Sequence, residues 1–138
     1  MTEKRLYIAY GSNMNAAQMK KRCPNSDWLG VACLEGWTLT LPFFANIEPS
    51  ANGRVPVRVW GLTAEDEKSL DRREGVDHGN YYKQNLNITF NGQTVSAMVY
   101  IMTDEYKKRT DKKARDGYVD TILEGYKECG FEPMPPLI

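Results

Sequence analysis

The sequence has few of the residues on which common hydrolytic, redox and metal sites depend. Its 138 residues include one histidine and three cysteines, Cys23, Cys33 and Cys129, with no CxxC pair. Without a second histidine this set argues against a structural zinc site, and its odd, scattered cysteines argue against a disulfide-stapled secreted domain. His78 has no acid or nucleophile in register, which disfavours Ser-His-Asp and Cys-His mechanisms.

An excess of charge of one sign and long hydrophobic runs are also lacking. The 18 Lys and Arg are balanced by 18 Asp and Glu, and the two signs are interspersed. This balance predicts no basic face for a nucleic acid or an anionic membrane. No run approaches the roughly 18–20 apolar residues of a transmembrane helix, and the apolar stretch at residues 6–10 is too short for a signal peptide. We therefore expect one soluble domain, residues 1–138, in the cytoplasm.

The first segments predict a strand, a turn and a helix in direct succession. Residues 6–10 form a short apolar run that Gly11 ends, as in a buried strand. Residues 14–23 then carry apolar side chains at three- and four-residue spacing, which predicts a short helix that Pro24 ends.

The next segment predicts β-structure followed by a loop. Between residues 27 and 44 the chain is rich in aromatic, Leu, Val and Thr residues, and Gly30 and Gly36 interrupt it, which predicts two strands. Residues 45–56 collect Asn, Pro, Ser and Gly and predict a polar loop bordering a site.

The middle of the chain predicts a strand at 57–62, a largely polar surface helix from Thr63 to about Glu74, and a cap at Gly75. Residues 81–90 and 94–102 are strand-like. Asn91-Gly92 joins them and is typical of a tight hairpin, because both residues tolerate positive φ.

The last segment, residues 114–129, predicts a helix with Gly130 past its end and a Pro-rich tail behind it. The order of elements predicts an α+β fold: a small curled, mainly antiparallel mixed sheet or barrel with helices packed outside.

The loop Tyr10-Gly11-Ser12-Asn13 is the first candidate for a binding site. It follows a buried strand and opens a helix, a position at which backbone N–H groups converge and favour an anion such as a carboxylate or phosphate. It matches neither GxGxxG nor GxxxxGK[ST], so no nucleotide fingerprint is present. The alternative is a plain turn in which Ser12 or Asn13 caps the helix.

Glu74 is the second candidate. A carboxylate at a helix C-terminus faces the negative end of the helix dipole, which raises its pKa and suits a general base near neutral pH. Partial burial acts in the same direction. The alternative is a solvated surface residue beside Arg72 and Arg73.

Tyrosines follow both candidates along the chain. Tyr81, Tyr82, Tyr100 and Tyr118 can place hydroxyl groups around a pocket. Equally, tyrosines in strands and helices pack in the core with only the hydroxyl in water.

Taken together, these segments resemble the γ-glutamylcyclotransferase family, with its γ-glutamylcyclotransferase-like or AIG2-like fold. Members share a YGSN loop after the first strand and a catalytic Glu in an EGV-like segment. The corresponding stretches here are YIAYGSNM at residues 7–14 and LDRREGV at 70–76. Weaker matches are VWGL at 59–62, GNY at 79–81, AMVYIM at 97–102, and Tyr118, Ile122, Gly125 and Gly130.

The resemblance implies an enzyme of the acyltransferase or lyase type that carries out an intramolecular aminolysis. The α-amine of a γ-glutamyl group attacks its own side-chain carbonyl and releases 5-oxoproline and a free amine or amino acid. On this basis Glu74 is the general acid and base, the amides of Gly11, Ser12 and Asn13 anchor the glutamyl carboxylate, and Tyr10, Tyr81, Tyr100 and Tyr118 line the pocket. The reaction requires neither a metal nor another cofactor.

The expected partner is thus a small γ-glutamyl substrate, with no nucleic acid and no membrane, and a homodimer is left open. Two alternatives remain. One is a non-catalytic module on the same fold that binds a γ-glutamyl compound or another carboxylate. The other is a protein-interaction domain that uses exposed aromatic side chains and has a broad apolar patch.

Overall fold

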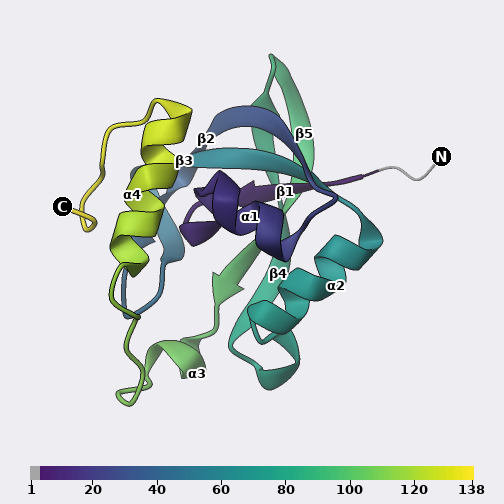
Figure 1. Ribbon diagram of the computed structural model, residues 1–138. Coiled ribbons are helices and arrows are strands. Elements are labelled where there is room, and N and C mark those ends of the chain that lie inside the picture. The colour runs from purple at the N-terminus through teal and green to yellow at the C-terminus, as the bar shows by residue number, and fades with distance from the viewer. Residues whose placement is uncertain (1–3) are drawn as a thin grey trace.

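A five-stranded sheet with helices on one side forms the molecule (Figure 1). The computed structural model describes residues 4–138. Along the chain the elements are β1 (Arg5–Ala9), η1 (Ser12–Met14), α1 (Ala16–Arg22), β2 (Asp27–Thr40), β3 (Asn46–Leu62), α2 (Ala64–Arg73), η2 (Val76–His78), β4 (Tyr81–Phe90), β5 (Gln93–Met102), α3 (Asp104–Lys107) and α4 (Tyr118–Cys129).

The sheet is mixed and curled. Its strand order is β2-β3-β1-β5-β4, in which only the β1–β5 pair is parallel. The two edge strands approach each other without pairing, since a Cβ at Gly30 of β2 would lie 3.1 Å from the ring of Phe90 in β4. The α+β prediction is confirmed, and of the two predicted forms the curled sheet is the correct one, because the barrel is not closed.

The parts of the chain with clear local signals fold as predicted. Thr63 caps α2 by accepting a hydrogen bond from the Asp66 N–H, and Gly75 follows the helix in the left-handed conformation with φ of 64°. The hairpin β4–β5 turns at Asn91-Gly92, where both residues have positive φ. Turn and cap chemistry therefore decides these boundaries.

The prediction of two strands between residues 27 and 44 is wrong. A single long strand, β2, runs to Thr40, with register shifts between Trp28 and Gly30 and between Glu35 and Trp37. At the first shift Leu29 is an extra residue on β2, and at the second Gly36 lies opposite residues 50–53 of β3. Both irregularities bend the ladder without ending it, so the glycines do not divide the strand.

The prediction of a polar loop at 45–56 is also wrong. These residues begin β3, which pairs with β2 from Asn46 opposite Thr40 onward. Their turn-like composition is overridden by pairing with a distant strand. The connecting turn lies at 41–45 instead, and its end borders the cavity described below.

Helix boundaries differ by a few residues. A short 3₁₀ turn, η1, precedes α1, which therefore begins at Ala16, and α4 begins at Tyr118 after an irregular segment. The four-residue helix α3 carries no signal noted in the sequence.

Helix α4 packs directly on the loop that follows β1. A Cβ at Gly125 would lie 2.8 Å from Met14 Cβ, so only glycine permits this approach. Arg58, 4% exposed, donates to the Met14 carbonyl and to Glu128 of α4, both at 2.7 Å. Its guanidinium lies against the rings of Trp28 and Trp60. These contacts hold η1 between the sheet and α4.

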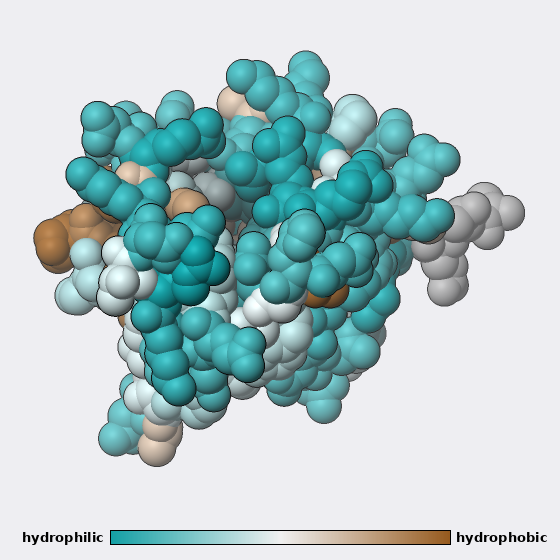
Figure 2. Space-filling model, turned by 90° about the horizontal axis from the view of Figure 1, so that it is seen from below, coloured by the Kyte–Doolittle hydropathy of each residue, from teal (hydrophilic) through white to brown (hydrophobic). Residues whose placement is uncertain are grey.

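No helix within residues 4–138 has the length and apolar character needed to cross a membrane. On the face seen in Figure 2, hydrophilic side chains predominate and apolar ones are scattered among them. The described residues of this face therefore lack the broad apolar patch that the protein-interaction alternative requires.

Candidate active site

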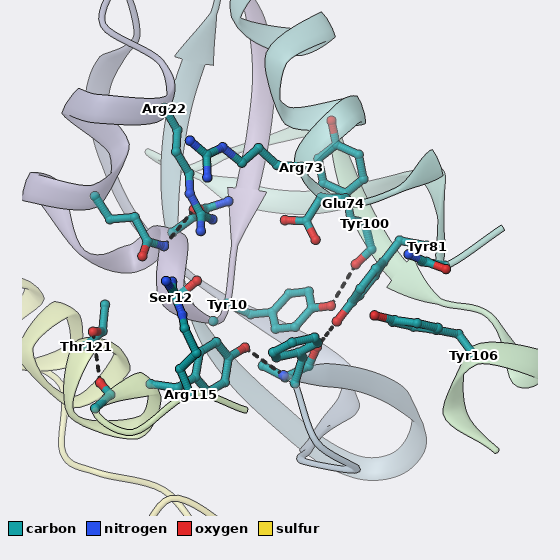
Figure 3. A pocket seen from close by; sticks show the side chains of 18 of the residues that line it. Tyr10, Ser12, Arg22, Arg73, Glu74, Tyr81, Tyr100, Tyr106, Arg115 and Thr121 are labelled. Atoms are coloured by element: carbon teal, nitrogen blue, oxygen red, sulfur yellow. Dashed lines mark hydrogen bonds between the residues drawn. The ribbon is translucent and has the colours of Figure 1, made fainter. Parts of the chain in front are cut away.

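A cavity of about 580 Å³ opens where the end of β1, the end of α2 and the start of α4 meet. It is lined by the eight residues to which the family resemblance assigns a role: Tyr10, Gly11, Ser12, Asn13, Glu74, Tyr81, Tyr100 and Tyr118. The fold thus brings the YGSN loop and the Glu74 segment, about sixty residues apart in sequence, to one site (Figure 3).

Glu74 is the C-cap residue of α2, and its carboxylate points into the space between the labelled tyrosines in Figure 3. The chain turns sharply after it at Gly75, which has φ of 64°, and glycine is required there because a Cβ would collide with the Asn80 side chain. Burial raises the pKa of Glu74 to about 7, and the nearby positive charge of Arg22 lowers it in part. This carboxyl group can therefore both accept and return a proton near neutral pH.

A ring of tyrosines surrounds that carboxylate. The pKa of each is raised above its ordinary value, chiefly by burial, and the negative charge of Glu74 contributes in every case. The six residues are Tyr7, Tyr10, Tyr81, Tyr100, Tyr106 and Tyr118. All of them remain protonated over the physiological range.

Three of these hydroxyl groups already donate within the protein. Tyr10 donates to the Tyr100 carbonyl at 2.8 Å, Tyr81 to the Ala45 carbonyl at 2.9 Å, and Tyr100 to the Asp71 carboxylate at 2.6 Å. Their oxygens can still accept a hydrogen bond, but their protons are committed. These tyrosines therefore shape the cavity more than they donate into it.

Tyr118 differs from these three. Its oxygen accepts the Ala45 N–H at 2.8 Å, and its own proton has no acceptor within residues 4–138. Ala45 is thus held through both backbone groups, by Tyr118 on one side and Tyr81 on the other.

Asp71 lies one turn before Glu74 on α2 and fixes Tyr100 from outside the cavity. Its second oxygen pairs with Lys83 at 3.0 Å, and Lys83 also pairs with Glu67 at 2.7 Å. The sequence motif around Glu74 thus includes a residue that orients the cavity wall.

The loop at 10–13 lies close to the opposite wall. A Cβ at Gly11 would lie 2.9 Å from the Ala45 Cβ, so glycine is required for this approach. Ser12 begins η1, and the first N–H groups of a helix have no acceptor in their own turn. Trp60 donates to the Asn13 carbonyl at 3.1 Å and so fixes the loop from the sheet.

The Asn13 side chain is not open to a ligand. It is 4% exposed, and its oxygen accepts from Gln18 at 3.1 Å and from Arg22 at 2.9 Å. Its amide nitrogen donates to the Tyr7 hydroxyl at 2.9 Å. The Asn13 side chain therefore holds the side chains of Tyr7, Gln18 and Arg22 in position and does not itself face the cavity with a free polar atom.

The sequence analysis missed several residues of the wall. Further lining residues include Tyr7, Gln18, Arg22, Arg73, Tyr106 and Arg115. Gln18 and Arg22 stand four residues apart on α1, which places them on one helix face, and this spacing was a usable signal. No local pattern marks Tyr106 or Arg115. Tyr82, one of the tyrosines considered, is 44% exposed and does not line the cavity.

Within residues 4–138 no three His, Cys, Asp or Glu side chains are arranged to hold a metal ion. The charged groups of the wall are Glu74, Asp116 and the three arginines Arg22, Arg73 and Arg115, a set that suits an anionic ligand.

Comparison with known proteins agrees with this picture. Residues 7–120 match the family model described as gamma-glutamyl cyclotransferase, AIG2-like. The chain is 30% identical to gamma-glutamylcyclotransferase of Mus musculus, over 91% of this chain and 72% of the relative. The corresponding protein of Homo sapiens is 29% identical with the same coverage.

A solved structure of a gamma-glutamyl cyclotransferase superposes with a TM-score of 0.77 at 25% identity, covering 98% of this chain and 83% of the other. A yeast gamma-glutamyl cyclotransferase specific to glutathione, at 10% identity and a TM-score of 0.54, shares the fold alone. Because the family model spans most of the chain and includes both the loop and Glu74, this protein belongs to the gamma-glutamyl cyclotransferase, AIG2-like family.

Proposed function

We propose that this protein is a γ-glutamyl cyclotransferase, which converts a γ-glutamyl amide into 5-oxoproline and a free amine or amino acid. The observation that carries the proposal is the placement of Glu74, with a pKa of about 7, across one cavity from the loop at 10–13. Family membership supports the same reaction class.

The reaction starts with the α-amine of the substrate. An α-amino group has an ordinary pKa of about 8 and is mostly protonated at neutral pH, so it must lose a proton before it can attack. Glu74 in its carboxylate form accepts that proton. The amine nitrogen then bonds to the γ-carbonyl carbon and closes a five-membered ring, and the proton held by Glu74 passes to the leaving nitrogen as the amide bond breaks. Glu74 then takes the extra proton from the ring nitrogen, which leaves 5-oxoproline with one N–H, and passes it to the released amine, so that Glu74 ends the cycle as a carboxylate.

The loop is proposed to hold the glutamyl α-carboxylate. The N–H groups of Gly11 and Ser12 lie at the start of η1, and Arg22 adds positive charge on the same side of the cavity. Holding the carboxylate here bends the substrate toward ring closure. Since nucleophile and electrophile belong to one molecule, this positioning supplies much of the rate.

The function is tested by incubating the protein with a panel of γ-glutamyl amino acids and γ-glutamylamines and measuring 5-oxoproline by mass spectrometry. We expect 5-oxoproline and the free amine in equal amounts from at least one class. Binding without turnover across the whole panel would instead identify a carboxylate-binding module.

The pH dependence follows from Glu74. Because the carboxylate form accepts the proton, kcat/KM should fall about tenfold for each pH unit below a midpoint near 7. Measuring kcat/KM between pH 5 and 8 under first-order conditions checks this. A profile that stays flat down to pH 5 would show that Glu74 is not the base.

A further inference from the structure

The hydrogen bonds around Asn13 have only one consistent set of directions. Arg22 has donors and no acceptor, so the Asn13 atom that it contacts at 2.9 Å must be the oxygen. Gln18 donates its amide N–H to the same oxygen at 3.1 Å. The other Asn13 atom is therefore the amide nitrogen, which can only donate.

That nitrogen lies 2.9 Å from the Tyr7 hydroxyl oxygen. Tyr7 must accept this hydrogen bond, and its own proton must point elsewhere. Tyr7 is 4% exposed and lines the cavity, and no acceptor for its proton exists within residues 4–138. The Tyr7 O–H bond is thus directed into the cavity.

The position of Tyr7 distinguishes it from Tyr10, Tyr81 and Tyr100, whose protons are committed to protein acceptors. Within the described part of the chain, Tyr118 also has a proton without a protein acceptor, but its oxygen accepts from the Ala45 backbone N–H, and no side chain orients its hydroxyl group as Asn13 orients that of Tyr7. Tyr7 and Glu74 line the same cavity, and among the charges that raise the pKa of Tyr7, Glu74 contributes most. Burial keeps Tyr7 protonated, so it stays a donor across the working pH range.

We propose that Tyr7 is a catalytic residue that donates a hydrogen bond to the γ-carbonyl oxygen as it becomes negative, and that Asn13 is the positioning residue that turns the Tyr7 proton toward it. The inference rests on the proposed function. It assigns the stabilisation of charge, as distinct from proton transfer, to a residue outside the loop and outside the Glu74 segment.

The step is balanced without any further reactant. The amine nitrogen bonds to the γ-carbon, and the carbonyl π electrons move to the oxygen, where the Tyr7 hydroxyl donates without giving up its proton. When the tetrahedral intermediate collapses, the C=O bond re-forms and the C–N bond to the leaving group breaks. Glu74 supplies the proton to the leaving nitrogen and takes the extra proton from the ring nitrogen. Tyr7 ends the cycle unchanged.

The first test is Tyr7→Phe. Removal of one donor of this kind typically lowers kcat by about 100- to 1,000-fold, and KM should change little because the donor acts mainly on the transition state. The midpoint of the pH profile should remain that of Glu74. A matched control is Tyr126→Phe, since Tyr126 is fully buried, does not line the cavity and has a hydroxyl without a partner.

The second test is Asn13→Asp, which reverses one hydrogen bond and keeps the shape of the side chain. The carboxylate can still accept from Gln18 and Arg22, but it cannot donate, so the Tyr7 proton should turn toward it and leave the cavity. We expect kcat at the high-pH plateau to fall by a similar factor of about 100. The double variant with Tyr7→Phe should be no slower than the slower single variant.

The outcomes separate this inference from the proposed function. A wild type that makes no 5-oxoproline overturns the function and the role of Tyr7 together. An active wild type with Tyr7→Phe within threefold of it overturns the inference alone. Additive losses in the double variant would show that Asn13 does not act through Tyr7. Thermal unfolding and binding of unreacted substrate, measured for each variant, identify any loss that arises from misfolding.

Discussion

Glu74→Gln is expected to lower the rate of 5-oxoproline formation by about 1,000-fold at pH 8, with little change in substrate affinity. The amide keeps the size of the side chain but cannot accept the proton of the attacking amine, and general acid–base groups contribute roughly 100- to 10,000-fold. Single-turnover rates and equilibrium binding, measured separately, check both halves of the expectation.

The same variant should be more stable than the wild type at high pH. The pKa of Glu74 is about 7 in the folded protein against 4.5 for an unperturbed group, so its favourable contribution is complete below pH 4.5 and disappears as pH rises through 7. At pH 8 we expect Glu74→Gln to raise the free energy of unfolding by about 2 kcal/mol, allowing for solvent in the cavity, and at pH 4 the difference should vanish.

Glu65→Gln is the matched control, because Glu65 is an exposed carboxylate on the same helix. It should leave the rate unchanged. If Glu74→Gln retained wild-type turnover, or if its stability showed no dependence on pH relative to the wild type, the role given to Glu74 would be wrong.

Gly11→Ala is expected to lower kcat/KM by about 100-fold. The new Cβ would lie 2.9 Å from the Ala45 Cβ, closer than side-chain carbons normally approach, so the loop or Ala45 must move. Ala45 holds the hydroxyl groups of Tyr81 and Tyr118 through its backbone. A displacement of about 1 Å in such a site can cost roughly 100-fold in rate.

Ala45→Gly supplies the control for this variant. It removes the methyl group that the new side chain meets, so the double variant Gly11→Ala/Ala45→Gly should recover most of the lost kcat/KM. Steady-state kinetics of the four proteins form a complete cycle. Failure of the second substitution to restore any activity would show that the contact between these walls is not the cause.

Local chemistry in the sequence was enough to predict the elements that begin or end on a strong signal. Thr63 marks the start of α2 and Gly75 its end, and Asn91-Gly92 forms the turn of the hairpin. These features could be predicted because caps and tight turns depend on a few adjacent residues. The stretch at 45–56 misled the prediction, because pairing with β2 is a long-range contact that its composition does not reveal.

The residues of the site also fall into those that local sequence could predict and those that it could not. The loop and Glu74 could be named, since each lies at an element end where dipoles and free N–H groups have known effects. Tyr7 and Arg22 could not, because their roles depend on the direction of hydrogen bonds to Asn13, which only the folded arrangement defines. The hydrogen bond that Tyr100 donates to Asp71 could not be predicted for the same reason.

The residues that line the cavity lie between positions 7 and 121 of the sequence, and no single continuous segment supplies half of them. A ligand that fills it therefore binds only when the sheet, α2 and α4 are all in place. Its binding energy is then added to the stability of the entire domain, by an amount that grows with the logarithm of ligand concentration. Thermal unfolding in the presence of candidate γ-glutamyl compounds can thus rank them by affinity, even for compounds that are never turned over.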